Sequence, residues 1–245
     1  MKWLGYLLSS LWRLWFLLIF ILVFILFMPA LFFFTAFVKN EIIVARLCRY
    51  WSKLTLYFSF IFPKVEWEEK LNQKEQYIFC PNHVSTLDIP FILAVLPMPL
   101  QYIGKAEIAK IPLFGYFFKN NSVIVDRTNK RNAYSAFIKA GEKLKIGINM
   151  CIFPEGGIPK SDVFLKKFKN GPFRLALDQN IKIVPITMPD SKNMFPEQYF
   201  KGRPGRVRIK IHKAIAPNSL EEKSIKYFNL SVYNTIFEQL KNYEQ

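Results

Sequence analysis

His83 and Asp88 are two side chains whose types and spacing could carry out proton transfer. A neutral imidazole accepts a proton near neutral pH, and a carboxylate beside it can orient the ring and stabilise the imidazolium. On a continuous helix this five-residue step would set the side chains about 140° apart, so they meet only across a turn. The spacing alone suits a general base with its orienting carboxylate, and equally a helix cap beside an ordinary polar residue.

The segments on either side of the pair predict such a turn. Residues 77–80 form a short apolar, β-favouring run that Pro81 stops, and an apolar helix-like stretch covers residues 89–95. Pro90 fits only the first turn of a helix, which puts Asp88 at the helix entrance. His83 is therefore predicted to lie on a strand-to-helix turn.

Beyond residue 63 the chain alternates strand-like and helix-like segments, the clearest helix covering residues 131–145. This alternation predicts an α/β fold with a mostly parallel sheet flanked by helices, preceded by an N-terminal membrane-anchoring segment of two helices. The predicted strands are residues 77–80, 101–104, 122–125, 150–153, 181–187 and 206–211.

Polar or special residues follow most of these strands at the point where each strand ends. Ligands bind at the carboxyl edge of parallel α/β sheets. Each residue alone could be a solvated loop charge or a cap, but the shared edge favours a binding site. The residues concerned are His83, Lys105, Asp126, Arg127, Glu155, Gly156, Gly157 and Asp190.

His212 is the second of the two histidines in the chain. It continues an alternation in which Arg206, Arg208 and Lys210 are separated by apolar residues. Such a pattern predicts the solvent-facing side of a strand. We therefore expect His212 to be exposed and to take no part in catalysis.

The net charge of +16 implies phosphate-bearing partners or an anionic bilayer. No nucleic-acid partner is predicted, because no recognition motif accompanies the charge. Cys48, Cys80 and Cys151 are few and widely spaced, which indicates a reducing compartment with neither a disulfide framework nor a zinc site. Two separate histidines without a ligand cluster predict no bound metal.

Residues 14–38 carry no formal charge and are long enough to cross a hydrocarbon core of about 30 Å. The run is too long for a signal-peptide core, so we expect it to be retained. Residues 40–62 predict an amphipathic helix with its basic side chains on one face. Either the first helix spans and the second lies flat, or the pair forms a hairpin in one leaflet. We expect residues 1–63 to be the anchor and residues 64–245 the α/β domain.

The basic residues around the anchor predict which side of the membrane the folded domain occupies. Lys39, Arg46, Arg49 and Lys53 outnumber the two basic residues before the apolar run, Lys2 and Arg13. Cytoplasmic segments carry an excess of Lys and Arg. Both anchor geometries therefore predict a membrane-associated protein with its folded domain on the cytoplasmic side of the cell membrane.

Several blocks of the sequence resemble the glycerophospholipid acyltransferases, specifically the 1-acylglycerol-3-phosphate acyltransferase group. The Asn-His-x4-Asp block is intact at residues 82–88, Phe-Pro-Glu-Gly stands at residues 153–156, and Val-Pro-Ile at residues 184–186. Lys105-Ala106-Glu107 is also similar to a family segment. The resemblance covers roughly residues 76–188, and the first and third blocks together are specific.

This chain departs from the family pattern in two places. Residues 121–127 keep mainly the Asp-Arg ending of the second block, and residues 157–161 read Gly-Ile-Pro-Lys-Ser where the family commonly has Thr-Arg-Ser. Lys160 can replace the charge of the missing arginine but not its bidentate geometry. The departures weaken the prediction of which acceptor is used more than the prediction of which reaction is catalysed.

The resemblance implies an O-acyltransferase of phospholipid biosynthesis that acylates the free hydroxyl of 1-acylglycerol-3-phosphate, giving phosphatidic acid. His83 would be the general base and Asp88 its orienting residue. No bound cofactor is implied, because the thioester donor, acyl-CoA or acyl carrier protein, is a substrate. The implied partners are the bilayer, the lysophospholipid and the donor. The residues implied to bind substrate are Lys105, Arg127, Glu155, Gly156 and Lys160.

Three other functions fit parts of the sequence. The altered segment 157–160 suits another lyso-lipid acceptor, such as a lyso-aminolipid. A membrane-bound phosphoesterase could use the same basic site with water in place of the acceptor. A non-enzymatic tether to anionic lipid needs only the anchor and the charge, and leaves His83, Asp88 and Glu155 without a purpose.

Overall fold

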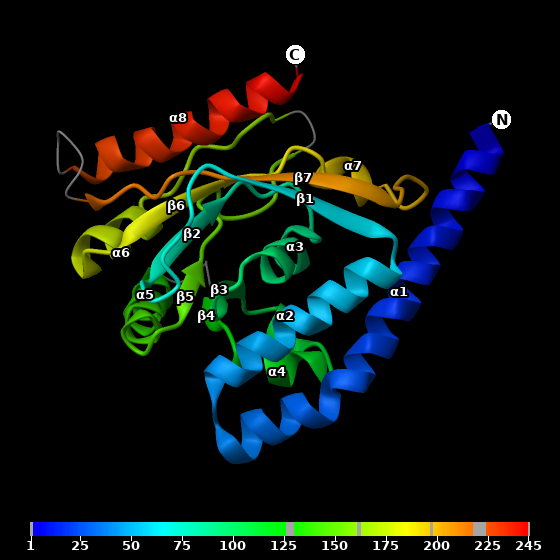
Figure 1. Ribbon diagram of the computed structural model, residues 1–245, viewed down its shortest axis with the longest axis horizontal. Helices are drawn as coiled ribbons and strands as arrows, with labels where there is room; N and C mark the ends of the chain where they lie inside the picture. The colour runs from blue at the N-terminus through cyan, green and yellow to red at the C-terminus, as the bar shows by residue number, and fades with distance from the viewer. Residues whose placement is uncertain (1, 126–129, 161–162, 197, 218–223, 245) are drawn as a thin grey trace.

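A seven-stranded sheet in the order β1-β7-β6-β2-β5-β3-β4 forms the centre of the computed structural model (Figure 1). The structure describes residues 2–125, 130–160, 163–196, 198–217 and 224–244. The strands are β1 (Ile61–Trp67), β2 (Tyr77–Pro81), β3 (Leu100–Lys105), β4 (Val123–Val125), β5 (Asn149–Cys151), β6 (Lys182–Thr187) and β7 (Gly205–Ile211).

Ten helical segments connect and cover these strands in the described part of the chain. The first is α1 (Lys2–Phe33), which continues as a π-helical turn (Phe34–Val38). The others are α2 (Glu41–Phe58), α3 (Asp88–Val95), a 3-10 turn (Ile108–Lys110), α4 (Phe114–Asn120), α5 (Lys130–Lys145), α6 (Gly171–Gln179), α7 (Ser191–Met194) and α8 (Ile225–Glu244).

The predicted mostly parallel sheet is confirmed. β2 pairs in parallel with β5 and β6, β3 pairs in parallel with β4 and β5, and β1 pairs in parallel with β7. Of the pairs that the structure describes, only β6 and β7 run antiparallel. The strand before His83 and the strand before Glu155 are therefore neighbours, which brings the two loops to the same edge of the sheet.

β1 was not predicted from the sequence, because residues 40–62 were interpreted as one amphipathic helix. α2 ends at Phe58, and β1 begins at Ile61 after Phe60 takes a left-handed conformation with φ of 59°. Pro63 lies within this strand. A proline cannot donate to the ladder, but β1 is an edge strand, where that donor is not needed.

Side chains of β2 point alternately to two hydrophobic cores, one on each face of the sheet. Phe79 packs with residues of α1, α2 and α3, whereas Ile78 and Cys80 pack with residues of α5, α6 and α8. All five residues of β2 are buried, as expected for a central strand covered on both faces. The turn that carries His83 therefore follows a strand that is packed on both of its faces.

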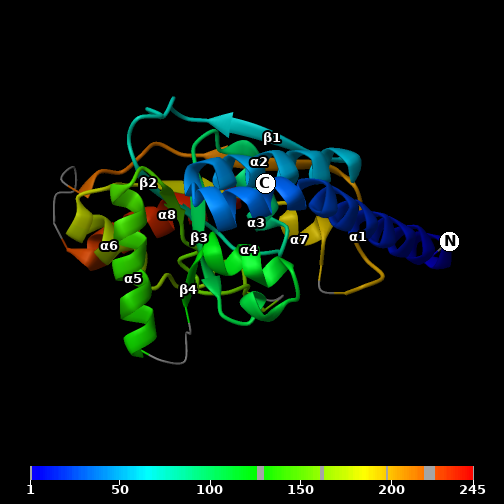
Figure 2. The same ribbon diagram turned by 90° about the horizontal axis from the view of Figure 1, so that it is seen from below.

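α1 and α2 form a helical hairpin that runs alongside the sheet layer (Figures 1 and 2). Trp12 and Trp15 of α1 donate their indole N–H groups to the carbonyls of Ser59 and Phe58, at 3.0 and 2.8 Å, where α2 ends. The helical segment Trp3–Val38 is long and apolar enough to cross a membrane by length and composition, with a mean hydropathy of 3.1. Its exposed apolar side chains indicate membrane association.

His212 is buried rather than exposed, so the prediction that it lies on a wet strand face is wrong. β7 ends at Ile211, and the His212 amide donates to the carbonyl of Pro185 at 3.0 Å. The imidazole lies between Glu68 Oε1, 3.0 Å from Nδ1, and Thr187 Oγ1, 2.8 Å from Nε2. Arg206 and Arg208 are exposed, as the alternation predicts. His212 lies beyond the end of β7 at Ile211, where the alternation no longer applies.

Candidate active site

The side chains of His83 and Asp88 meet across the turn between β2 and α3, as their spacing predicts. His83 Nδ1 lies 2.9 Å from Asp88 Oδ2. Asp88 is the first residue of α3 and is fully buried. Because an ionised carboxylate only accepts hydrogen bonds, Nδ1 carries the proton and Nε2 is left as the acceptor. This is the tautomer that a general base needs.

Asp88 also folds the turn that carries His83. The same oxygen, Oδ2, accepts hydrogen bonds from the amides of Val84 at 2.7 Å and Ser85 at 2.8 Å. These charge-assisted bonds wrap the backbone around the carboxylate. The Asp88 side chain therefore fixes both the ring of His83 and the path of the chain that leads to it.

Phe153 fixes the plane of the His83 ring. The two rings stack with centroids 3.9 Å apart and an interplanar angle of 22°. Tyr102 of β3 stacks on Phe153 in turn, at 6.1 Å, and donates its hydroxyl hydrogen to the carbonyl of Ile89 at 2.9 Å. With 14% of its side chain exposed, His83 presents little more than one edge of its ring. Nothing in the residue type of Phe153 or Tyr102 separates them from ordinary core aromatics, and the sequence analysis missed them.

Glu155 holds the backbone behind the site through two hydrogen bonds. Its Oε1 accepts the amide hydrogen of His83 at 2.6 Å, and its Oε2 accepts that of Lys166 at 3.0 Å. Burial raises the pKa of the Glu155 carboxyl, while these two amides oppose the rise. The side chain is fully buried and does not line the neighbouring cavity. This position does not favour the substrate-binding role that the resemblance implies for Glu155.

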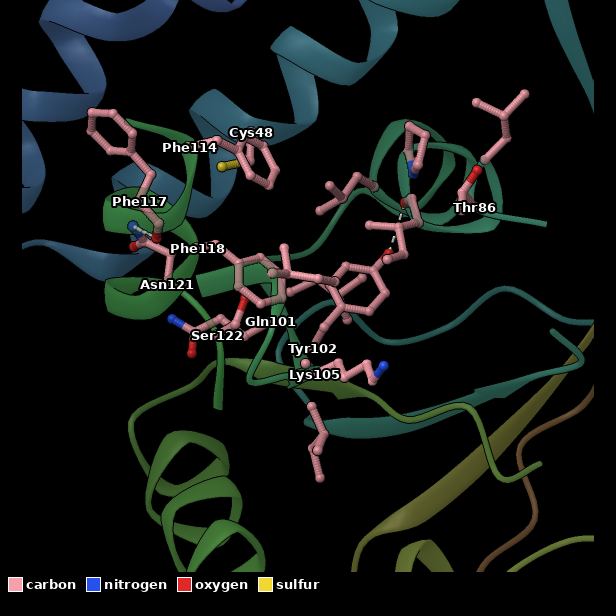
Figure 3. A pocket seen from close by; sticks show the side chains of 18 of the residues that line it. Cys48, Thr86, Gln101, Tyr102, Lys105, Phe114, Phe117, Phe118, Asn121 and Ser122 are labelled. Atoms are coloured by element: carbon pink, nitrogen blue, oxygen red, sulfur yellow. Dashed lines mark hydrogen bonds between the residues drawn. The ribbon is translucent and has the colours of Figure 1, made fainter. Parts of the chain in front are cut away.

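A cavity of about 810 Å³ is lined by His83 together with residues of α1 and α2. Its lining is mostly apolar. Figure 3 shows how β3 contributes Gln101, Tyr102 and Lys105, while Cys48 reaches the cavity from α2. Further lining comes from aromatic side chains of α1, α2 and α4, among them Phe16, Phe20, Phe24, Trp51, Phe114 and Phe117.

The other predicted site residues fall into three groups. Gly156 and Lys105 line the cavity with His83, and Lys105 Nζ lies 3.3 Å from Glu107 Oε1. Lys160 is exposed and does not line the cavity. Arg127 and the neighbouring Asp126 lie outside the described residues.

Asp190, which also follows a predicted strand, does not join the site. Its carboxylate binds the guanidinium of Arg208 through two hydrogen bonds of 2.9 and 2.7 Å. A bidentate pair of this kind ties the end of β6 to β7. Within the described ranges, no group of three or more His, Cys, Asp or Glu side chains could hold a metal ion.

Comparisons with known proteins find matches within one enzyme family. A model of the acyltransferase family matches residues 63–189, just over half of the 245 residues. A 1-acyl-sn-glycerol-3-phosphate acyltransferase of Saccharomyces cerevisiae is 29% identical over 181 residues, covering 73% of this chain and 59% of the relative. One of Chlamydomonas reinhardtii is 32% identical over 143 residues, covering 58% and 42%. The chain thus spans about half the length of these relatives.

The fold is shared with a solved structure. The crystal structure of the 1-acyl-sn-glycerophosphate acyltransferase PlsC from Thermotoga maritima has a TM-score of 0.77 at 21% identity, covering 100% of this chain and 98% of that one. At this identity the likeness establishes the common fold. Together with the match over residues 63–189, it leads to one conclusion: the chain belongs to the acyltransferase family.

Proposed function

We propose that this protein is an O-acyltransferase that moves a fatty acyl group from a thioester to the free hydroxyl of 1-acylglycerol-3-phosphate, giving phosphatidic acid. The observation that carries the proposal is the contact of 2.9 Å between His83 Nδ1 and Asp88 Oδ2, with His83 in the lining of a mostly apolar cavity. The names of the relatives from S. cerevisiae and C. reinhardtii support the choice of acceptor.

The reaction needs one proton acceptor and no protein nucleophile. His83 Nε2 takes the proton of the acceptor hydroxyl while that oxygen attacks the thioester carbonyl carbon. Asp88 stabilises the imidazolium that forms, as in a Ser-His-Asp triad with the substrate hydroxyl in place of serine. When the tetrahedral intermediate collapses, the C–S bond breaks, and the imidazolium proton goes to the departing thiolate.

The cavity suits the apolar chain of a lipid substrate. It is lined by His83 and by residues of α1, α2, α3, β3 and α4, so an acyl chain placed there can bring its reactive end to the imidazole. Lys105 is proposed to bind the phosphate of the acceptor, as is Arg127. Lys160 would join them only from an exposed position away from the cavity lining.

The N-terminal hairpin is proposed to lie in one leaflet, with the folded domain on the cytoplasmic side. One face of α1 is buried along its length at Trp12, Phe16, Ile19, Val23 and Leu31. A helix that crossed the bilayer away from the domain would lose these contacts. The opposite face of α1 is apolar and exposed, as expected for a helix that meets lipid. The anchor then holds the cavity at the depth of the lysolipid.

A panel of acceptors tests the function. The purified protein is given lysophosphatidic acid, lysophospholipids with larger headgroups and a lyso-aminolipid, each with labelled acyl-CoA or acyl carrier protein, and products are identified by mass spectrometry. Phosphatidic acid as the main product supports the proposal, and the better donor identifies the second substrate. Acylation of the lyso-aminolipid alone would assign another acceptor. Phosphate release without a donor would indicate a phosphoesterase, and no product at all would favour a lipid tether.

A further inference from the structure

Lys169 lies directly over the backbone of Gly156, a residue that lines the cavity together with His83. A Cβ atom built on Gly156 would lie 2.6 Å from Cε and 2.8 Å from Nζ of Lys169. Gly156 has φ of 75°, which disfavours any side chain at this position independently of the crowding. The end of the Lys169 side chain therefore lies where a side chain on Gly156 would begin.

Backbone hydrogen bonds hold Lys169 next to the loop that contains Gly156. The Lys169 amide donates to the Pro154 carbonyl at 2.8 Å, and the Gly156 amide donates to the Phe153 carbonyl at 3.1 Å. The second bond closes a four-residue turn, whose end Cα atoms lie within about 7 Å of each other. Phe153 stacks on His83 at 3.9 Å. The ammonium of Lys169 is thus one tight turn away from the residue that stacks on the base.

The charge of Lys169 is not used elsewhere in the described part of the protein. Lys169 is exposed, and it forms no ion pair with a described residue. Glu155, its near neighbour in this loop, already accepts the amides of His83 and Lys166 and is buried. By contrast, Lys105 is paired with Glu107. An ammonium that pairs with no carboxylate among the described residues, and that lies against the cavity-lining Gly156, is suited to an anionic group of a substrate.

We propose that Lys169 binds the phosphate monoester of the acceptor and so determines the preference for a phosphorylated lysolipid. This inference rests on the proposed acyl transfer. It adds to the proposed contacts of Lys105 and Arg127 a positive charge that lies against Gly156, a residue of the cavity lining. A lysine binds phosphate as a point charge, which suits an ammonium approaching over a bare glycine.

Three variants test the role of Lys169. Lys169→Met keeps the length of the side chain without its charge, Lys169→Arg restores the charge, and Lys167→Met is a matched control from the same exposed segment. Steady-state kinetics are measured at saturating donor with lysophosphatidic acid and with the phosphate-free monoacylglycerol. We expect Lys169→Met to raise KM for lysophosphatidic acid by about tenfold to a hundredfold, the loss of one charge-assisted contact. With monoacylglycerol, Lys169→Met should have the KM of the parent. Lys169→Arg should recover most of the affinity for lysophosphatidic acid, and Lys167→Met should leave the KM for both acceptors unchanged.

Several results would overturn the assignment. They are an unchanged KM for lysophosphatidic acid, an equal loss with both acceptors, and a rise in KM for the donor alone. Binding of lysophosphatidic acid is also measured by calorimetry without a donor. If the parent protein binds lysophosphatidic acid without turnover and Lys169→Met weakens this binding tenfold, the proposed acyl transfer is refuted while the proposed phosphate site is supported. If turnover proceeds and binding is indifferent to Lys169, only the phosphate site fails.

Discussion

The carboxylate of Glu155 accepts the amide hydrogen of His83 at 2.6 Å, although 72 residues separate the two in the chain. The second oxygen of the same carboxylate holds the amide of Lys166 at 3.0 Å. One buried side chain thus joins the loop that carries the base to the segment that leads to Lys169. The Glu155 of the Phe-Pro-Glu-Gly block thus holds His83, the proposed base, and the segment that leads to Lys169, the proposed phosphate ligand, relative to each other.

Glu155→Gln should therefore lower both stability and kcat. A glutamine can accept from one of the two amides, but its NH2 group faces the other amide hydrogen. Leaving one buried donor unsatisfied costs about 1–3 kcal/mol. Chemical denaturation and steady-state kinetics check this, and a variant with the parent's unfolding midpoint and kcat would show that the carboxylate does not organise the site.

Asp88→Asn should reduce kcat by about two to four orders of magnitude, because a neutral amide does not stabilise the positive charge of the imidazolium that His83 forms. The asparagine oxygen can still accept from the amides of Val84 and Ser85, so the fold of the turn should persist. Kinetics combined with circular dichroism separate the two effects. Full activity in a folded variant would contradict the orienting role.

Acidification should destabilise the protein through His212. Burial lowers the pKa of His212 below its usual 6.5, Glu68 opposes the shift, and Lys210 adds to it. The unfolded chain then binds a proton that the folded protein does not, so stability from this group is present above pH 6.5 and is lost as pH falls below that value. Urea unfolding between pH 7.5 and pH 5 should show a shallower pH dependence for His212→Gln than for the parent. An identical slope would exclude His212 as the cause.

The position of α1 can be tested by labelling from outside intact spheroplasts with a membrane-impermeant maleimide. Leu4 and Val38 lie near the two ends of the apolar helical segment and are exposed. If the hairpin lies in the cytoplasmic leaflet, neither Leu4→Cys nor Val38→Cys should react above the level of the parent. Permeabilised spheroplasts, in which Leu4→Cys should react, provide the control. A reaction of Leu4→Cys in intact spheroplasts would establish a spanning helix.

Local patterns predicted the parts of the protein that depend on short-range sequence. The apolar runs gave six of the seven strands, and the spacing of His83 and Asp88 gave the turn on which they meet. β1 was missed because its first residues, the apolar Ile61 and Phe62, were assigned to the amphipathic helix predicted before it. His212 was placed wrongly because alternation along a strand says nothing about where the strand ends.

Long-range contacts of the site could not be predicted in the same way. No local feature tells which amide a glutamate will meet 72 residues away, and Glu155 was accordingly expected to touch substrate. Phe153 has the appearance of a core aromatic, and Lys169 that of a solvated lysine. Each acquires a role only after β2 and β5 pair and bring their following loops together. The cavity, similarly, exists only because α1 and α2 pack over β3 and α4.

The central claim is that His83 is the general base for acyl transfer to a lysolipid hydroxyl. The most direct test is the rate at which purified His83→Ala converts lysophosphatidic acid and a labelled acyl thioester to phosphatidic acid, measured by mass spectrometry. Circular dichroism and liposome flotation establish that the variant is folded and membrane-bound. We predict that a folded, membrane-bound His83→Ala protein forms no phosphatidic acid above the rate without enzyme. Acyl transfer at the parent's rate would contradict the account.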